Sequence, residues 1–334
     1  MTLGDPAGVG PEICLRLLAD AQIAGLCRPI VFGSAAILRR VADVTGLAPP
    51  ASVVSALADA DDGPCVLDIG ELDANAVEPG RVSAACGQAA FEACSSAIDA
   101  AISGTVAAVV TAPACKEALH AAGHRTPGHT EIFSERLKAP RSCMMQYSEI
   151  LTCSFVTTHV GYADVPALLS TERILDVIEL TDEMLRHLRG RSPVIAVCGL
   201  NPHAGEHGLF GDREEERIIL PAIERARAKR LIVTGPHPGD TAFTPKARAT
   251  HDAVVCMYHD QGHIPVKALA FESAVNTTLG LPVPRTSVDH GTAFDIAWKG
   301  EADWTSLSHA VRLAVRLASR PPPLETATSR QASS

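Results

Sequence analysis

Residues 253–267 of this 334-residue chain carry the sequence AVVCMYHDQGHIPVK, in which an apolar run leads directly into a polar cluster. The run Ala253–Met257 predicts a buried strand. Tyr258–Lys267 then sets an imidazole, a carboxylate, a Gly-His-Ile-Pro turn and a lysine at the carboxyl end of that strand. In open α/β sheets ligands bind at this edge, so we expect the stretch to form an active-site rim.

Outward from this stretch, apolar runs of strand length alternate with helical patterns. We expect strands at Pro29–Gly33, Cys65–Ile69, Val106–Thr111, Ile150–Thr157, Val194–Cys198 and Ala253–Met257. We expect helices at Pro11–Ala24, Ser34–Thr45, Ala84–Ser103, Thr171–Leu188, Glu214–Lys229 and Asp303–Ala318. The alternation predicts an α/β fold with a largely parallel sheet and helices on both faces. The Pro-, Ser- and Thr-rich residues 321–334 are expected to form a disordered tail.

Composition and charge set the broad class of protein. A hydrophobic content of 46% with 20% charged residues predicts a soluble globular chain. The net charge of −9 argues against non-specific nucleic-acid binding, although a local basic cluster can still bind an anionic substrate. No apolar run reaches about 18 residues, so we expect no membrane span. The ten cysteines form no CxxC pair, which favours a reducing cytoplasm.

Three histidines share one context, because each follows the end of an apolar run: His159, His203 and His259. In a parallel sheet these ends gather on one edge, so the imidazoles can converge. Three neutral imidazoles with one open position are typical of a catalytic divalent-metal site. The alternative is that each histidine caps its strand or hydrogen-bonds a loop. Spacing alone leaves the identity of the metal open.

Carboxylates and cations accompany these histidines. Asp260 and Asp240 fall in loops at the same edge, where they can orient imidazoles or transfer a proton. Capping of a turn is the alternative for both. The set Lys267, Asn276 and Arg285 carries groups that suit a carboxylate or a phosphate.

Two further segments concern phosphate and nucleotide binding. His129 and Thr130 are expected to open a helix, where free amides and a hydroxyl favour a phosphate. Ser287–Ala297 is expected to be a loop that enters a helix. No GxGxxG motif follows a strand, which argues against a Rossmann site. Gly4–Gly10 lacks the lysine and the hydroxyl of a Walker loop.

Several motifs together resemble the 4-hydroxythreonine-4-phosphate dehydrogenase family of vitamin B6 biosynthesis. These motifs are GDPAGVGPE at 4–12, GHTE at 128–131, NPHAGE at 201–206, YHDQG at 258–262 and RTSVDHGTA at 285–293. The resemblance implies an α/β fold like that of isocitrate and isopropylmalate dehydrogenases, with two domains, mostly parallel sheets and an interdomain cleft. The expected subdomains are roughly residues 1–125 plus 270–320, and residues 126–269.

The resemblance also implies the components of the site. A divalent metal, most often zinc with magnesium or cobalt as alternatives, is expected on His159, His203 and His259, one of them supplied by the second subunit of a homodimer. The implied substrate-binding residues are His129, Thr130, Lys267, Asn276 and Arg285. The residues expected to be catalytic are Asp260, Lys267 and Asp240. The implied contacts to NAD or NADP are Asp289, His290, Gly291 and Thr292.

The implied reaction is oxidation of the C3 hydroxyl of 4-phosphooxy-threonine, followed by decarboxylation to 3-amino-2-oxopropyl phosphate. His263-Ile264-Pro265, Gly208–Asp212 and Phe294–Trp298 look more like a branch that oxidises 4-phospho-D-threonate or 4-phospho-D-erythronate to dihydroxyacetone phosphate and CO2. A cis-dihydrodiol dicarboxylate dehydrogenase is a third possibility within the family. From another class, a zinc hydrolase stays open, although no HExxH glutamate supports it.

Overall fold

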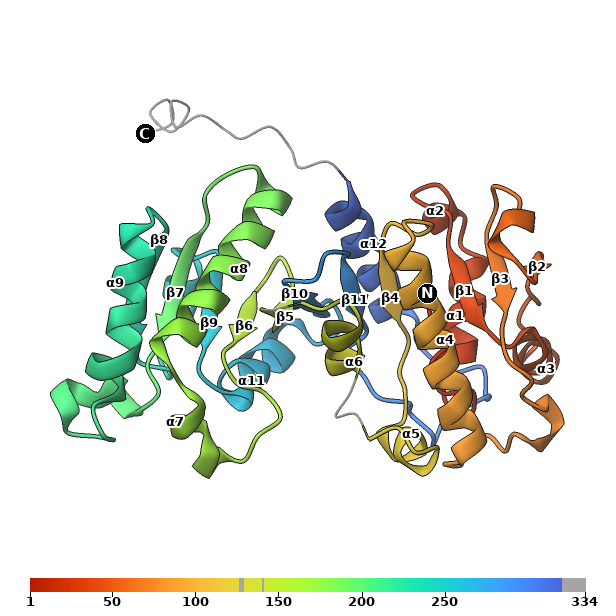
Figure 1. Cartoon of the computed structure of the whole chain (residues 1–334), viewed down its shortest axis with the longest axis horizontal. Helices are drawn as coiled ribbons and strands as arrows, with labels where there is room; N and C mark the ends of the chain where they lie inside the picture. The colour runs from red at the N-terminus through yellow and green to blue at the C-terminus, as the bar shows by residue number, and fades with distance from the viewer. Residues whose placement is uncertain (126–128, 140, 320–334) are drawn as a thin grey trace. The chain divides into compact units, whose positions relative to one another are not determined.

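The computed structural model describes residues 1–125, 129–139 and 141–319, and for residues 129–131 it describes the backbone alone. The chain divides into two compact units, which are described separately (Figure 1). Unit 1 comprises Met1–Ala139 and Leu281–Ala318, and unit 2 comprises Pro140–Gly280. The tail expected at residues 321–334 lies outside the described residues.

The strands of unit 1 form two parallel ladders. One is a three-stranded sheet in the order β1-β3-β2, and the other pairs β4 with β11. The bounds are β1 Ile30–Gly33, β2 Val53–Val54, β3 Cys65–Asp68, β4 Val109–Thr111 and β11 Arg285–Ser287. Thr2 connects the two ladders, because it bridges in parallel to both Phe32 and Thr111.

The helices of unit 1 are α1 Gly10–Leu18, α2 Ala21–Ala24, α3 Ala35–Thr45, α4 Ala84–Ile102, α5 Lys116–Ala121, α6 His129–Arg136 and α12 Thr305–Ala318, with 3₁₀ turns at Leu57–Asp59 and Ala74–Ala76. Side-chain caps fix several starts: Ser34 accepts from Ile37 N, and Ser83 accepts from Cys86 N. The long helix α4 packs its alanine and cysteine face against Phe32 of β1. Small side chains on α4 therefore bring the helix close to the sheet.

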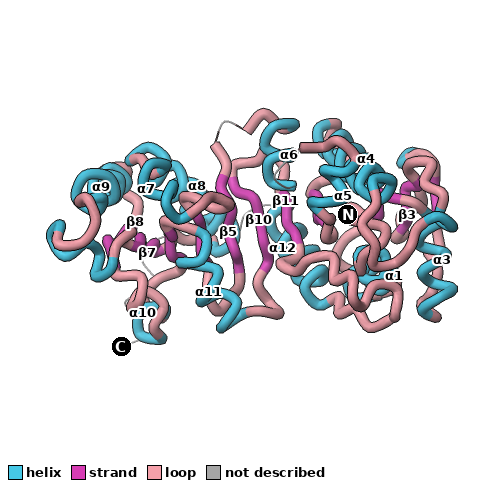
Figure 2. The backbone as a smooth tube through the Cα atoms, turned by 90° about the horizontal axis from the view of Figure 1, so that it is seen from below, coloured by secondary structure: helices cyan, strands magenta, loops and turns pink. Residues whose placement is uncertain are grey.

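The strands of unit 2 lie in the order β10-β5-β6-β9-β7-β8. The bounds are β5 Cys143–Tyr147, β6 Cys153–Phe155, β7 Val194–Cys198, β8 Ile232–His237, β9 Ala253–Cys256 and β10 Val275–Leu279. The pairs β10–β5 and β5–β6 are antiparallel, whereas β6, β9, β7 and β8 are mutually parallel. Figure 2 shows β5 and β10 side by side. Because β6, β9, β7 and β8 are parallel, their carboxyl ends lie at the same edge of the sheet.

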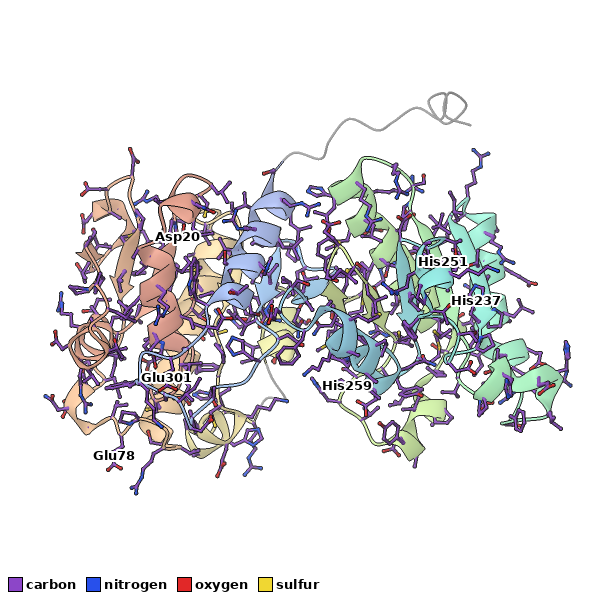
Figure 3. All side chains as sticks on the ribbon, turned by 180° about the vertical axis from the view of Figure 1, so that it is seen from behind. Asp20, Glu78, His237, His251, His259 and Glu301 are labelled. Carbon is purple, nitrogen blue, oxygen red and sulfur yellow. The ribbon has the colours of Figure 1, made fainter. Side chains whose placement is uncertain are left out.

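The helices of unit 2 are α7 Val165–Leu168, α8 Thr171–Arg189, α9 Leu220–Ala228, α10 Pro245–Arg248 and α11 His259–Ala270, with 3₁₀ turns at Tyr162–Asp164 and Pro202–Gly208 and a π turn at Glu215–Ile219. Helices α8 and α9 cover one face of the sheet (Figure 1), and α11 covers the other (Figure 3). Among the described residues, no helix is both long and apolar enough to cross a membrane.

Helix α11 corrects the sequence prediction of a Gly-His-Ile-Pro turn. The helix begins at His259 and continues through Pro265. Gln261 stabilises its start, because its Oε1 accepts from Met257 N at 2.7 Å and its Nε2 donates to Gly199 O at 2.8 Å. A Cβ on Gly262 would lie 2.7 Å from Phe155 Cε1, so glycine is needed for α11 to approach the sheet this closely.

Other predicted elements are confirmed or corrected. The expected helices over 34–45, 84–103, 171–188 and 303–318 are present within two residues at each end, and the strand at Val194–Cys198 has the expected bounds. The helix expected over 11–24 is two helices, α1 and α2, and the helix expected over 214–229 begins as a π turn. The loop at 287–297 does not enter a helix, because turns follow it and α12 starts at Thr305. Strands β2, β5, β8, β10 and β11 were not predicted from the sequence.

Candidate functional site

The carboxyl ends of the parallel strands in unit 2 carry the residues that the sequence singled out. His159 follows β6, His203 follows β7, Asp240 follows β8 and His259 follows β9. Because these strands are parallel, their polar successors occupy one edge of the sheet. Figure 3 labels His259 at the start of α11.

His159 and His259 come together. Their ring centroids lie 5.8 Å apart with an interplanar angle of 42°. A zinc-bound imidazole nitrogen lies about 2 Å from the ion, so two rings on one ion have centres roughly 5–6 Å apart. The observed spacing therefore fits two ligands of one metal ion.

The orientation of the His259 ring is set by its neighbour in sequence. His259 Nδ1 lies 2.6 Å from Asp260 Oδ1, and Tyr162 donates its hydroxyl hydrogen to Asp260 Oδ2. A carboxylate oxygen only accepts, so Nδ1 is the donor and Nε2 of the neutral ring keeps its lone pair. The Tyr162 hydrogen bond, and then the one from His259, lower the pKa of Asp260. Asp260 thus stays ionised and supports His259 as a metal ligand.

His263 packs behind His259 and was missed as a positioning group. Its ring stacks on His259 at 3.8 Å with an interplanar angle of 8°, and on Phe155 at 4.4 Å. Its Nδ1 lies 3.0 Å from His259 O and is therefore a donor. Burial, and then the proximity of His259, lower the pKa of His263 to about 4, so the ring is neutral near pH 7. The i, i+4 spacing of the two histidines is the signal that identifies this stack on a helix.

His203 does not join this group. It is exposed in the turn Pro202–Gly208, and its ring contact is with Phe210, at 6.1 Å between centroids. Within the described residues, no three histidine, cysteine or acidic side chains gather closely enough to hold a metal ion. A site that uses all three imidazoles is therefore not formed by the described residues of one chain, and the expectation that a second subunit supplies one of them stays a prediction.

The remaining unit 2 candidates lie on different elements. Lys267 is exposed on α11, two helical turns after His259. Asn276 lies on β10 opposite Gln146 of β5, and its buried Oδ1 has no hydrogen-bond partner in the part of the chain that the structure describes. That oxygen accepts only, so it suits a hydroxyl or an ammonium group of a ligand. Asp240 is exposed in the turn after β8.

Unit 1 holds the candidates for anion and nucleotide binding. Arg285 is buried in β11, where it donates to Thr111 Oγ1 at 2.6 Å and its guanidinium carbon lies 5.5 Å from the centre of the Phe133 ring. His129 and Thr130 are the first residues of α6, which confirms the helix start, but their side chains lie outside the described residues.

The loop after β11 contacts the glycine-rich loop near the start of the chain. His290 Nδ1 lies 2.9 Å from Gly291 O, so Nδ1 donates, while the buried Nε2 is left as an acceptor with no hydrogen bond among the described residues. Thr292 O accepts from Val9 N at 3.0 Å. Asp289 is half-buried at the start of this loop. This Nε2 therefore has a lone pair available to accept a hydrogen bond from a ligand.

Comparisons with known proteins identify the family of the chain. A family model described as "Pyridoxal phosphate biosynthetic protein PdxA" matches residues 25–314. The chain is 43% identical to the 4-hydroxythreonine-4-phosphate dehydrogenase of Desulforapulum autotrophicum, over 94% of this chain and 93% of that one. It is also 43% identical to the D-threonate 4-phosphate dehydrogenase of Salmonella typhimurium, over 95% and 98%.

A solved structure extends the likeness to the fold. The crystal structure of 4-hydroxythreonine-4-phosphate dehydrogenase from Klebsiella pneumoniae is similar with a TM-score of 0.83 and 44% identity, covering 95% of this chain and 98% of that one.

Proposed function

Because the chain belongs to the PdxA family of pyridoxal phosphate biosynthetic proteins, we propose that it is a dehydrogenase of a small acid phosphorylated on C4. Relatives named as dehydrogenases support an oxidoreductase and weigh against a zinc hydrolase. The observation that carries the proposal is the pair His159 and His259, with Asp260 and Tyr162 fixing the second ring. The two-domain architecture of isocitrate and isopropylmalate dehydrogenases is part of the same proposal.

We propose that His159 and His259 hold a divalent cation, zinc first among the candidates. When bound, such an ion supplies stabilisation of negative charge on the C3 oxygen of the substrate. Asp260 holds His259 in the tautomer whose Nε2 can coordinate, and His263 restricts the ring from behind. Asp240 and Lys267 are exposed near the same sheet edge and are proposed to handle the hydroxyl proton and the charge of the acid.

The third metal ligand is proposed to come from a second copy of the chain. Within the described residues of one chain, His203 forms no three-ligand group with His159 and His259, which supports a shared site in a homodimer. Unit 2 also exposes large apolar side chains, including Tyr162 at 66%, Ile264 at 65%, Phe271 at 64% and Leu209 at 70%. Apolar exposure of this extent is typical of an interface between subunits.

The electron acceptor is proposed to be NAD or NADP. Asp289, His290, Gly291 and Thr292 are the proposed contacts, and the buried His290 Nε2 offers an acceptor to the nucleotide. A bound nicotinamide would supply the acceptor for the hydride from C3. His129, Thr130, Asn276 and Arg285 are proposed to bind the carboxylate, the C2 substituent and the phosphate, fixing C3 for the transfer.

The proposed substrate is 4-phosphooxy-threonine, which gives 3-amino-2-oxopropyl phosphate after loss of CO2. D-Threonate 4-phosphate, giving dihydroxyacetone phosphate and CO2, is the second candidate, because the Salmonella typhimurium relative carries that name at equal identity. An assay of NADH formation with each acid, with zinc present, decides between them. No NADH or NADPH from these acids, from D-erythronate 4-phosphate or from a cis-dihydrodiol dicarboxylate would contradict the proposed reaction.

A further inference from the structure

The turn that carries His203 has an uncommon backbone. Five consecutive residues have positive φ: His203 at 54°, Ala204 at 52°, Gly205 at 78°, Glu206 at 41° and His207 at 57°. Four of them carry a Cβ, which disfavours the left-handed conformation for each. Such a run persists only where surrounding contacts impose it, and such backbone outliers cluster at functional sites.

Glu215 makes those contacts. Glu215 is buried, with an exposed fraction of only 2%. Oε1 accepts from Leu200 N at 2.9 Å and from Asn201 N at 2.8 Å, and Oε2 accepts from Asn201 Nδ2 at 3.1 Å. Gly205 lies so close that an added Cβ would be 2.5 Å from Oε2. The Glu215 carboxylate therefore binds Leu200 and Asn201, which precede the turn, and packs against Gly205 at the centre of the turn.

Glu214 is the second glutamate that accepts a hydrogen bond from the Asn201 side chain. Its Oε2 accepts from Asn201 Nδ2 at 2.9 Å and from Asp212 N at 2.8 Å, so it also ties the exit of the loop. These two acidic residues lie where α9 is extended at its start by the π turn Glu215–Ile219. Single π turns are frequent at functional sites, because the wider turn re-aims the side chains at its start.

We propose that Glu215, assisted by Glu214, is the positioning residue that holds His203 ready as a metal ligand. This inference rests on the proposed function, in which His203 binds the cation. Neither glutamate touches the reacting atoms. A carboxylate suits the role because it accepts only, whereas glutamine would turn an NH₂ group toward donors and break at least one of the hydrogen bonds.

The test measures zinc affinity of the full-length protein, by competition with a chromophoric chelator, alongside the thermal midpoint. Glu215→Gln is expected to weaken zinc binding about 10–100-fold, the range for groups that orient metal ligands. Glu214→Gln is expected to weaken it less, because the backbone of Leu200 and Asn201 keeps its acceptor. Glu216→Gln is the matched control, since Glu216 lies in the same π turn and its Oε2 makes no hydrogen bond among the described residues.

The His203→Ala variant separates the proposed metal site from the proposed positioning role of Glu215. If His203→Ala binds zinc like the unmodified chain, the proposed metal site fails and the role of Glu215 fails with it. If His203→Ala loses zinc while Glu215→Gln and Glu214→Gln retain full affinity, only the positioning role is overturned. Should Glu215→Gln not fold, Glu214→Gln decides, and an affinity and thermal midpoint equal to those of Glu216→Gln would contradict the inference.

Discussion

At the scale of single residues, the support of His259 by Asp260 is the most direct contact to test. Asp260→Asn replaces an ionised acceptor by an amide, so Nδ1 of His259 loses its charge-assisted partner. We expect zinc affinity and kcat to fall by about 10–100-fold. Tyr162→Phe is the control with a smaller expected loss, because the carboxylate still faces His259. Zinc affinity equal to that of the unmodified chain would remove Asp260 from the site.

Asp5 provides a prediction of pH dependence within unit 1. Burial raises the pKa of this carboxyl from 3.8 to about 6, against the lowering effect of the hydrogen bond from Ala7 N. At a pH between these two pKa values, the folded state binds more protons at Asp5 than the unfolded state does. The contribution of Asp5 to the free energy of unfolding therefore falls as pH rises through this window and is constant above it.

Asp5→Asn removes this titration and keeps an acceptor for Ala7 N. Relative to the variant, the unmodified chain should lose about 3 kcal/mol of stability between roughly pH 4 and pH 6, from about 1.4 kcal/mol per pKa unit. Both tryptophans, Trp298 and Trp304, lie in unit 1, so their fluorescence in urea reports on this unit. Parallel pH profiles for the two proteins would contradict the prediction.

Sequence alone identified some of these residues and missed others for a physical reason. His259 and Asp260 are adjacent in the chain, so their contact was predictable. Tyr162 reaches Asp260 across 98 positions, and no local pattern indicates that contact. Glu215 was likewise hidden, because a glutamate near a helix start is ordinarily a solvated residue that favours the helix dipole.

At the scale of elements, the close approach of α11 to the sheet depends on Gly262. An added Cβ would lie 2.7 Å from Phe155 Cε1 and 2.8 Å from Cys256 Sγ. Gly262→Ala should therefore cost about 1–3 kcal/mol of stability, as overpacking does, and displace His259 at the start of the helix. Urea unfolding and zinc affinity measure the two effects. Gly63→Ala is the control, because no described atom lies within 4 Å of its added Cβ, and equal results for both variants would refute the packing argument.

Strands β7 and β9 were predictable because they are short, continuous apolar runs. Strands β5 and β10 were not, because Gln146 interrupts β5 and Thr277 and Thr278 interrupt β10. The parallel strands β2, β8 and β11 were missed as well. Helix α11 was read as a turn since Gly262 and Pro265 are strong helix breakers. Packing against Phe155 and the bonds of Gln261 overcome that local preference.

At the scale of the whole molecule, the proposed dimer has a consequence that single-chain variants cannot reveal. If His203 reaches the metal only in a second subunit, a site needs His203 from one chain and both His159 and His259 from the other. His203→Ala and His259→Ala should each be inactive alone as homodimers. In a mixed dimer, one site combines the intact His203 of one chain with the intact His259 of the other, and the second site lacks both.

Subunit exchange between these two inactive variants should therefore restore activity. Random exchange makes about half of the dimers mixed, each with one intact site of two, so about a quarter of the unmodified activity is expected. NADH formation measures it, and His159→Ala mixed with His259→Ala is the control that should stay inactive, because their ring contact places both residues in one chain. No recovery from His203→Ala with His259→Ala, in a preparation whose exchange is verified by mass spectrometry, would contradict a site shared between two subunits.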